Sequence, residues 1–251
     1  MAAFGVGGAA TPRATSSLDG SQIRVLACDY DGTLAYEGRV AEATTGALGR
    51  FKASGRRLLM VTGREVRHLI ALYRYLPLFD AVVAENGAVL YVPALADERL
   101  LSPAPPPALI EALQRFDVQP LALGRIIIST PIANEDRLRA AIEASGAAWR
   151  IIRNKGSAMA LPAGIDKATG LAAALESLGL SADETLGVGD AENDETFLAA
   201  CGASAAPAGA LPLVKGQAHI VTAHDNGAGV VELIDELLRQ DAARNRSPAA
   251  G

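Results

Sequence analysis

Two carboxylates that could share one cation stand in the segment DYDGT, directly after a short apolar run. Residues two apart in an extended segment point the same way, so Asp29 and Asp31 should face one side. Two such charges repel one another, and a cation or a shared proton is needed between them. Gly32 allows a sharp turn behind the pair. The alternative without a chemical role is a polar turn after a strand, since Asp and Gly favour turns.

Two other segments carry groups that could bind an anion. Thr62, Gly63 and Arg64 follow a second apolar run and open a helical stretch, where a hydroxyl and free N–H groups suit a phosphate. Plain helix capping by Thr62 is the alternative. Lys167 begins another helical stretch, where a cation adds to the positive field of the helix N-terminus and would hold an anion. The alternative for Lys167 is a solvated surface position.

A fourth polar cluster, GVGDAEND at Gly187–Asp194, closes a further apolar run. It crowds the oxygens of Asp190, Asn193 and Asp194 at one strand end. Oxygen ligands of this kind suit a hard cation such as Mg²⁺. An Asx turn with a helix N-cap explains one of the aspartates well but explains the whole cluster poorly.

All four clusters lie next to elements that alternate between strand and helix. Short apolar runs predict buried strands, and apolar residues at helical spacing separate them; the runs are Ile23–Cys28, Arg57–Val61, Ala81–Ala84 and Thr185–Val188. This alternation predicts a Rossmann-like α/β fold, with a mostly parallel sheet and helices on both faces. In an open α/β sheet, ligands gather outside the carboxyl ends of the strands, which is where these clusters fall.

The alternation of strand and helix stops in residues 87–162, because this stretch has too many short strands to be a simple crossover between two parallel strands. The sequence predicts a hairpin, a Pro-rich loop, two helices and three further strands in this stretch; the strands are Val89–Val92, Arg99–Leu101, Arg125–Thr130, Trp149–Arg153 and Ala158–Leu161. We interpret it as a smaller α/β domain inserted into a core made of residues 22–86 and 163–240. Residues 1–21 and 241–251 are expected to be flexible tails.

Composition narrows the possible partners and location. The net charge is −5 and no block of Lys or Arg follows a phosphate backbone, which argues against nucleic acid. No apolar run reaches the length of a membrane span, so no membrane association is expected. Cys28 and Cys201 lie outside any metal-binding array and are expected to be buried thiols of a cytoplasmic protein. The oligomeric state stays open.

Taken together, the four clusters resemble the motifs of the haloacid dehalogenase superfamily of phosphohydrolases. DYDGT, the Thr of VTGR, Lys167 and GDAEND stand in that family's order. The insertion between the second and third clusters resembles the α/β cap of the sugar-phosphatase-like branch. The segments Glu85–Ala88 and Gly227–Val230 are also similar to that branch, and the resemblance covers residues 22–240.

The resemblance implies a role for each residue of the clusters. Asp29 would attack phosphorus and form a transient aspartyl phosphate. Asp31 would protonate the leaving oxygen and then activate water. The implied cofactor is Mg²⁺, held by Asp29, the backbone carbonyl of Asp31 and Asp190, with support from Asp194 and Asn193. Thr62 and Lys167 would bind the phosphoryl oxygens. Further candidates for substrate binding, which do not come from the resemblance, are Gly63, Asn86 and Arg64; Arg64 could instead tie the cap to the core.

Three functions follow as expectations. The leading one is a Mg²⁺-dependent phosphatase of a small phosphorylated metabolite, of the sugar phosphate or phosphoglycolate type. A sugar phosphomutase shares the aspartyl-phosphate chemistry, and a non-catalytic phosphate-ester-binding protein is the third reading. The sequence leaves open which substrate is used and which inserted residues select it. Arg125, Arg153, Asn154 and Lys155 are expected to give the insertion a polar, partly basic face, which either contacts the leaving group of the substrate or is solvated surface. Asn86 could reach a substrate or be a turn residue before Gly87.

Overall fold

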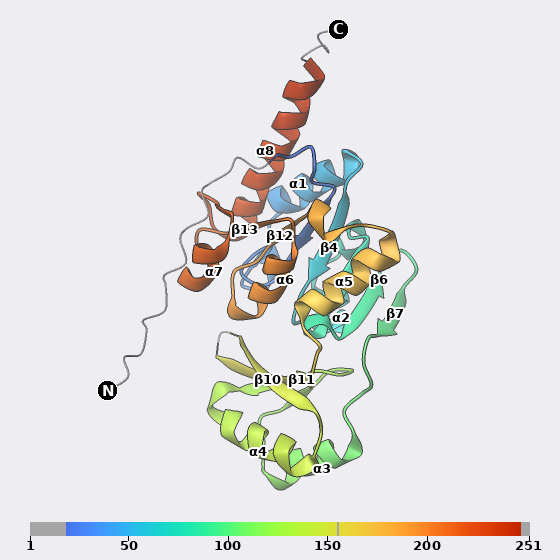
Figure 1. Cartoon of the computed structure of the whole chain (residues 1–251), viewed down its shortest axis with the longest axis vertical. Helices are drawn as coiled ribbons and strands as arrows, with labels where there is room; N and C mark the ends of the chain where they lie inside the picture. Colours follow the sequence, from blue (N-terminus) through green and yellow to red (C-terminus); the bar gives the residue numbers. More distant parts are fainter. Residues whose placement is uncertain (1–18, 155, 247–251) are drawn as a thin grey trace, which may run out of the picture.

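The computed structural model describes residues 19–154 and 156–246, and its centre is an eight-stranded sheet (Figure 1). Six strands are parallel, and the last two continue the sheet as an antiparallel hairpin. In spatial order the strands are β14 (Ile220–Val221), β13 (Ala203–Ala206), β12 (Thr185–Val188), β1 (Val25–Cys28), β4 (Arg57–Val61), β5 (Ala81–Ala84), β6 (Val89–Val92) and β7 (Asp97–Leu100). The predicted parallel α/β sheet is confirmed.

Helices cover both faces of this sheet because its strands are apolar on both sides. In β1, Leu26 and Cys28 pack on one face, and Val25 and Ala27 pack on the other. The first face carries α1 (Glu42–Ala53), α2 (Val66–Leu72) and α8 (Asn226–Arg246). The second face carries α5 (Lys167–Leu178), α6 (Glu195–Ala200) and α7 (Pro212–Gln217). The expected Rossmann-like layering is therefore present.

A smaller antiparallel sheet lies beside the large one, beyond the carboxyl ends of its parallel strands (Figure 1). Its strands, in spatial order, are β10 (Trp149–Asn154), β11 (Ser157–Pro162), β9 (Ile128–Pro131) and β8 (Ala122–Leu123). Alternate residues of β11 divide its two faces. Ala158 and Ala160 pack beneath α3 (Pro107–Arg115) and α4 (Glu135–Ser145), and Met159 and Leu161 join the main core cluster. The smaller sheet thus turns its helix-free face toward the large sheet.

Short elements complete the described chain. Two short strands, β2 (Ala35–Tyr36) and β3 (Arg39–Val40), pair with each other close to the first polar cluster. The single-turn helices are η1 (Leu76–Leu78), η2 (Glu85–Gly87), η3 (Ile132–Asn134), η4 (Ala182–Glu184) and η5 (Glu192–Asp194). No helix among residues 19–154 and 156–246 is long and apolar enough to cross a membrane.

The inserted stretch differs in two ways from the pattern expected of it. The hairpin of β6 and β7 extends the large sheet, because β6 pairs with the core strand β5 along Val82–Ala84. The strand expected at Arg125–Thr130 begins only at Ile128, because the N–H groups of Arg125–Ile127 are donated to a side chain instead of a neighbouring strand.

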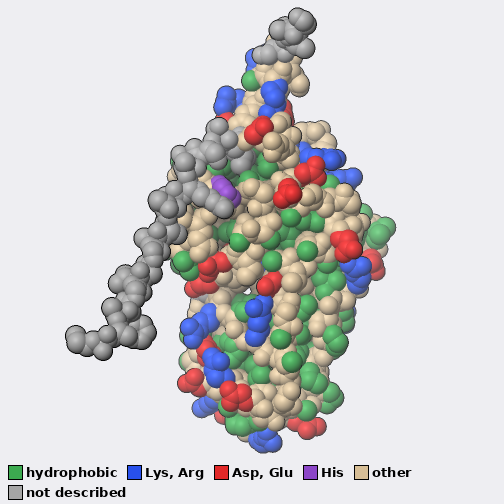
Figure 2. All heavy atoms as spheres, viewed as in Figure 1, with side chains coloured by type: hydrophobic (Ala, Val, Ile, Leu, Met, Phe, Trp, Pro, Cys, Tyr) green, Lys and Arg blue, Asp and Glu red, His purple; other side chains and the backbone are tan. Residues whose placement is uncertain are grey.

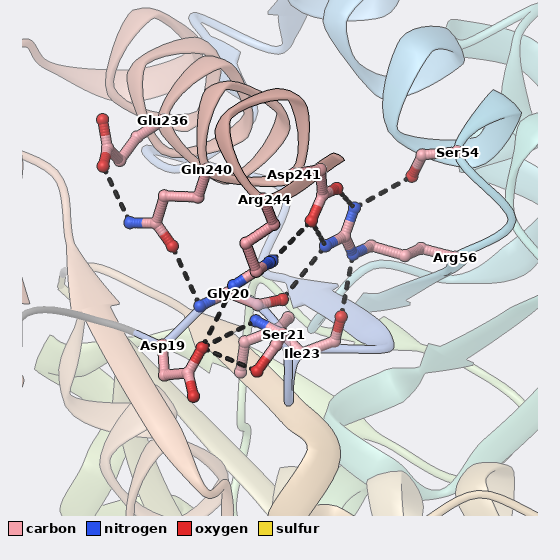
Figure 3. Close-up of polar contacts among 10 residues, drawn as sticks. All are labelled: Asp19, Gly20, Ser21, Ile23, Ser54, Arg56, Glu236, Gln240, Asp241 and Arg244. Carbon is pink, nitrogen blue, oxygen red and sulfur yellow. Dashed lines mark hydrogen bonds and ion pairs between the residues drawn. The ribbon is translucent and has the colours of Figure 1, made fainter. Parts of the chain in front are cut away.

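Both tail boundaries also differ from the expectation, because polar contacts hold residues that carry no apolar pattern (Figure 3). Helix α8 continues to Arg246. Gly20 donates its N–H to Oε1 of Gln240 at 3.0 Å and accepts from Nη2 of Arg56 at 3.0 Å. Arg56 also donates to both carboxylate oxygens of Asp241, at 2.6 and 3.1 Å. Residues 1–18 and 247–251, the rest of the expected tails, lie outside the described residues.

Candidate active site

The predicted polar clusters meet at the carboxyl edge of the large sheet. Asp29 directly follows β1, Thr62 follows β4, and Asp190 stands two residues after β12. These three strands are parallel neighbours, so their carboxyl ends lie side by side. Lys167 is the first residue of α5, on the same edge. Segments far apart in the sequence are therefore brought together by the sheet.

Three buried aspartates form a compact acidic group. One ligand oxygen each from Asp29, Asp190 and Asp194 lies within 4.8 Å of the others. The acid of Asp194 is held by the backbone N–H groups of Asp190 and Ala191, at 2.8 and 2.9 Å. Thr33 donates its hydroxyl to Oδ1 of Asp190 at 3.1 Å. Backbone and hydroxyl donors thus hold the carboxylates of Asp190 and Asp194 in place.

Lys167 supplies the positive charge inside this group. Its ammonium donates to Oδ1 of Asp29 at 2.6 Å and to Oδ1 of Asp194 at 2.5 Å, and the side chain is 1% exposed. Burial disfavours the ammonium, but the attraction of Asp194 and Asp29 outweighs burial and raises the pKa of Lys167 above its usual value. Burial, aided by repulsion from Asp194 and Asp190 and opposed by Lys167, raises the pKa of Asp29 to about 8.

The residues present fit a divalent cation. Among Asp29, Asp190, Asp194 and Lys167, negative charge exceeds positive charge by two when all four are ionised. Buried charge of one sign is costly, and the raised pKa of Asp29 expresses that cost as tighter proton binding. A cation with a charge of two, bound through hard carboxylate oxygens, would balance the group. The three aspartates could therefore hold a divalent metal ion.

Lys167 reaches the acids because α5 packs against the turn η2 at very short range. Gly87, in that turn, has a φ of +103°, and a Cβ built there would lie 1.8 Å from the carbonyl oxygen of Asp166. A Cβ on Gly170 of α5 would lie 2.5 Å from the Cα of Gly87. Asp166 caps α5 by accepting from the N–H of Thr169 at 2.9 Å, so Lys167 begins the helix. Glycine at both contact points allows this approach.

Asp31 lies outside the acidic group and pairs with Arg64. The guanidinium donates from Nε to Oδ2 of Asp31 at 2.5 Å and from Nη2 to Oδ1 at 2.7 Å. Arg64 also stacks on the ring of Tyr30, 5.2 Å from its centroid. Thr62 is buried, and its hydroxyl accepts from the N–H of Arg64 at 3.1 Å. The second cluster thus contacts the first through a bidentate ion pair, which the sequence did not indicate.

Asn86 links three parts of the molecule. It is fully buried, with a φ of +54°, in the turn after β5. Its Oδ1 accepts from Nδ2 of Asn193 at 2.8 Å, and its Nδ2 donates to Sδ of Met159 in the smaller sheet at 3.2 Å. Asn86 is therefore the expected turn residue, and its side chain also contacts two other elements; that it reaches a substrate stays a prediction.

Comparison with known proteins identifies the family of this chain. The sequence model of haloacid dehalogenase-like hydrolases matches residues 26–124 and 109–234. This chain belongs to that family.

Curated relatives of this hydrolase match along most of its length. Phosphoglycolate phosphatase 2 of Saccharolobus solfataricus is 30% identical, over 87% of this chain and 94% of the relative. The phosphoglycolate phosphatase of Aeropyrum pernix is 31% identical, over 86% of this chain and 94% of the relative.

Solved structures share the fold of this hydrolase. A haloacid dehalogenase-like hydrolase from Bacteroides thetaiotaomicron has a TM-score of 0.72 at 20% identity, over 86% of this chain and 99% of that one. A sugar phosphatase of subclass IIB has a TM-score of 0.66 at 21% identity, over 88% and 98% of the two chains. The α/β core with its added smaller sheet is thus a known arrangement.

A cavity of about 500 Å³ opens between the two sheets of the hydrolase, next to Lys167. Its far wall, from the smaller sheet and α4, carries Arg139, Arg150 and Arg153. Glu135 orients two of them, accepting from Arg139 at 2.6 Å and from Nε of Arg153 at 2.7 Å. On this lower part of the face, Figure 2 shows Lys and Arg side chains interspersed with Asp and Glu side chains. The cavity therefore has Lys167 on one side and a basic wall of three arginines on the other.

The residues expected to form one partly basic face on the insertion lie in different places in the structure. Arg153 lines this cavity, but Arg125 lies in another cleft, where it pairs with Glu98 at 2.9 Å. Lys155 lies outside the described residues. Sequence reasoning missed Glu135 and Arg150, because only the fold brings them toward Lys167. Sequence reasoning also gave no separate role to Glu85, because the only feature that marked this residue was its position before Asn86-Gly87.

Proposed function

We propose that this hydrolase is a magnesium-dependent phosphatase in which Asp29 takes the phosphoryl group from a small phosphorylated metabolite. The observation that carries the proposal is the buried group of Asp29, Asp190 and Asp194 around the ammonium of Lys167. Relatives that match most of the chain at 30–31% identity are named phosphoglycolate phosphatases, which supports phosphoglycolate as the first substrate to test.

The acidic group would hold Mg²⁺ through Asp29 and Asp190, with Asp194 supporting the site and the backbone carbonyl of Asp31 completing it. Bound there, the ion would supply charge neutralisation for the phosphoryl oxygens beside the nucleophile. Hard oxygen ligands favour Mg²⁺ among common divalent ions. Asn193 would keep the loop of Asp194 in place through its contact with Asn86.

Asp29 would act as the nucleophile and form an aspartyl phosphate that water then removes. A carboxylate approaches a phosphate dianion only where the negative charge is balanced, and the ammonium of Lys167 lies 2.6 Å from Asp29 for that purpose. Lys167 and Thr62, with the N–H groups that follow Thr62, would bind the phosphoryl oxygens. Positioning and electrostatics carry most of phosphoryl-transfer catalysis.

Asp31 would protonate the leaving oxygen and afterwards activate water. It stands two residues after Asp29, and its side chain is 43% exposed, so solvent protons can reach it. Arg64 fixes both carboxylate oxygens of Asp31, which makes it an orienting residue for this acid and base. General acid–base help of this kind contributes about 10²–10⁴-fold to rate.

The substrate would lie in the cavity between Lys167 and the basic wall. We assign residues 102–162 as a cap over a core of residues 19–101 and 163–246, following the division of the two sheets. Arg139 and Arg153 of the cap would then meet the part of the substrate beyond the phosphate. A carboxylate such as that of phosphoglycolate suits a guanidinium partner. A cytoplasmic location agrees with the free, buried thiols of Cys28 and Cys201.

Phosphate release from phosphoglycolate, measured with and without Mg²⁺, tests the proposal. Asp29→Asn keeps the size of the side chain and should lower turnover by at least about 10⁴-fold, as removal of a covalent nucleophile does in other enzymes. Circular dichroism would show that the variant is folded. Full activity of the folded variant would refute the nucleophile. Phosphorus NMR with a hexose 1-phosphate identifies a mutase, which would return an isomerised sugar phosphate instead of free phosphate.

A further inference from the structure

Glu85 is a buried carboxylate at the junction of core and cap, outside the acidic group. It follows β5, is 1% exposed, and has a φ of +51°, which is uncommon for a residue with a side chain. Its Oε1 accepts the N–H of Arg125 at 2.9 Å, and its Oε2 accepts those of Ile126 and Ile127 at 2.8 and 2.9 Å. Among the described residues, no Lys or Arg side chain pairs with it.

A buried carboxylate destabilises the folded state unless hydrogen-bond donors satisfy its oxygens, so Glu85 depends on the donors around it. Three N–H groups converge on Glu85, and hydrogen bonds to a charged acceptor are stronger than those between neutral groups. All three belong to the cap segment Gly124–Ile127, whereas Glu85 belongs to the core. The contact therefore connects the two parts through a side chain of one and the backbone of the other.

The cap segment is shaped to meet this carboxylate. A Cβ built on Gly124 would lie 2.6 Å from Oε2 of Glu85, so a glycine permits the approach. Ile126 and Ile127 are 0% and 5% exposed and pack into the main core cluster. The side chain of Arg125 adds an exposed ion pair to Glu98 of β7 at 2.9 Å. The segment is thus held by burial and by Glu85 together.

From Glu85, contacts lead directly to the site. Its own N–H donates to the carbonyl of Arg64 at 3.0 Å, and Arg64 holds Asp31. The next residue, Asn86, donates its N–H to the carbonyl of Thr62 at 2.9 Å and contacts Asn193 through its side chain. The position of the cap is thereby tied to residues on both sides of the acidic group.

We propose that Glu85 is a positioning residue that fastens the cap over the site, so that the basic wall of the cavity faces Lys167. This inference rests on the proposed function. Loss of the carboxylate would leave Asp29 and its neighbours intact and reduce the fraction of molecules with a closed cap. Apparent substrate affinity falls in proportion to that fraction, so the effect should appear in KM more than in kcat.

Two variants break the contact from opposite sides. Glu85→Gln keeps the shape but turns an NH₂ group toward backbone donors, and Gly124→Ala pushes the cap segment away from Oε2. With phosphoglycolate and Mg²⁺, each should raise KM about tenfold or more and change kcat by less than about threefold, as a tenfold smaller closed fraction requires. Hydrogen exchange of the amides of Arg125–Ile127 should quicken about tenfold. Glu98→Gln, which removes only the exposed ion pair on the same segment, should leave KM within about twofold.

Several results would overturn the inference. Quickened exchange with an unchanged KM would make the contact merely structural, and unchanged exchange would show that the carboxylate does not hold the segment. A fall in kcat at constant KM would place Glu85 in the chemistry. If Glu85→Gln does not fold, Gly124→Ala carries the test. Failure of the wild-type protein to release phosphate would refute the proposed function instead, and the exchange measurement would still decide whether Glu85 holds the cap.

Discussion

Replacing Gly87 by alanine should damage the site from a distance, because it separates α5 from the turn that supports it. The new Cβ would start 1.8 Å from the carbonyl oxygen of Asp166, and ordinary contact begins at 3.4 Å, so the two backbones must part by about 1.6 Å. Lys167 follows Asp166 directly, and its ammonium would move with the helix. A misplacement of about 1 Å can cost about 10²-fold in rate.

The matched control is Gly55→Ala. Gly55 has a φ of +89°, so alanine meets a similar backbone penalty of about 1–2 kcal/mol, but nothing lies within 4 Å of its new Cβ. Urea unfolding should therefore show a loss for both variants, with the larger loss for Gly87→Ala. Phosphate release, measured where both are fully folded, should fall about 10²-fold for Gly87→Ala alone. Equal activity of the two variants would refute the claim that this contact positions Lys167.

Three other perturbations test separate parts of the structure. Mg²⁺ should raise the Tm of the wild-type protein, and Asp190→Asn should abolish most of that rise in a thermal scan, because ligand binding stabilises the folded state. Hydrogen bonds from Arg56, and to a smaller degree from Arg244, lower the pKa of Asp241, so they add stability that is present above the unfolded-state pKa and is lost as pH falls through the lowered value; urea titrations of Arg56→Gln should show a smaller acid-side loss, because Arg244 still pairs with Asp241. Arg153→Gln should raise KM for phosphoglycolate about tenfold, as loss of one charged hydrogen bond predicts. KM for methyl phosphate, which has no carboxylate, should stay within about twofold. A rise of KM for both substrates would contradict a contact between Arg153 and the substrate carboxylate.

The core was predictable from sequence because its signals are local. Apolar runs such as Arg57–Val61 pack on both faces of the sheet, and most of them are followed by a helix that returns the chain to the same sheet. The order of such elements leaves few topologies open. Polar residues at the ends of parallel strands then meet at one edge, so Asp29 and Asp190 could be expected to lie close together.

Features that depend on distant partners could not be predicted. The hairpin of β6 and β7 has the same local pattern whether it pairs with the core or with the cap, and only its pairing with β5 decides the matter. The chain at Arg125–Ile127 reads as a strand, but its N–H groups bond to Glu85, forty residues earlier in the chain. Likewise, the pair of Asp31 and Arg64 joins two clusters whose side-chain directions no spacing rule supplies.

The turn Glu85–Gly87 shows why the fold tolerates backbone strain at this place. All three residues have positive φ values, 51°, 54° and 103°, although two of them carry side chains. Each residue makes a contact to a different part of the molecule: Glu85 to the cap segment, Asn86 to Asn193 and Gly87 to the start of α5. An extended chain alternates the sides to which its residues point, so it could not make these contacts with three successive residues. The left-handed turn does so, and it lets one short segment set the position of the cap, the acidic loop and Lys167 together. Strain that surrounding contacts hold in place is typical of functional sites, and here a cost of about 1–3 kcal/mol for each of Glu85 and Asn86 accompanies the placing of three elements around one site.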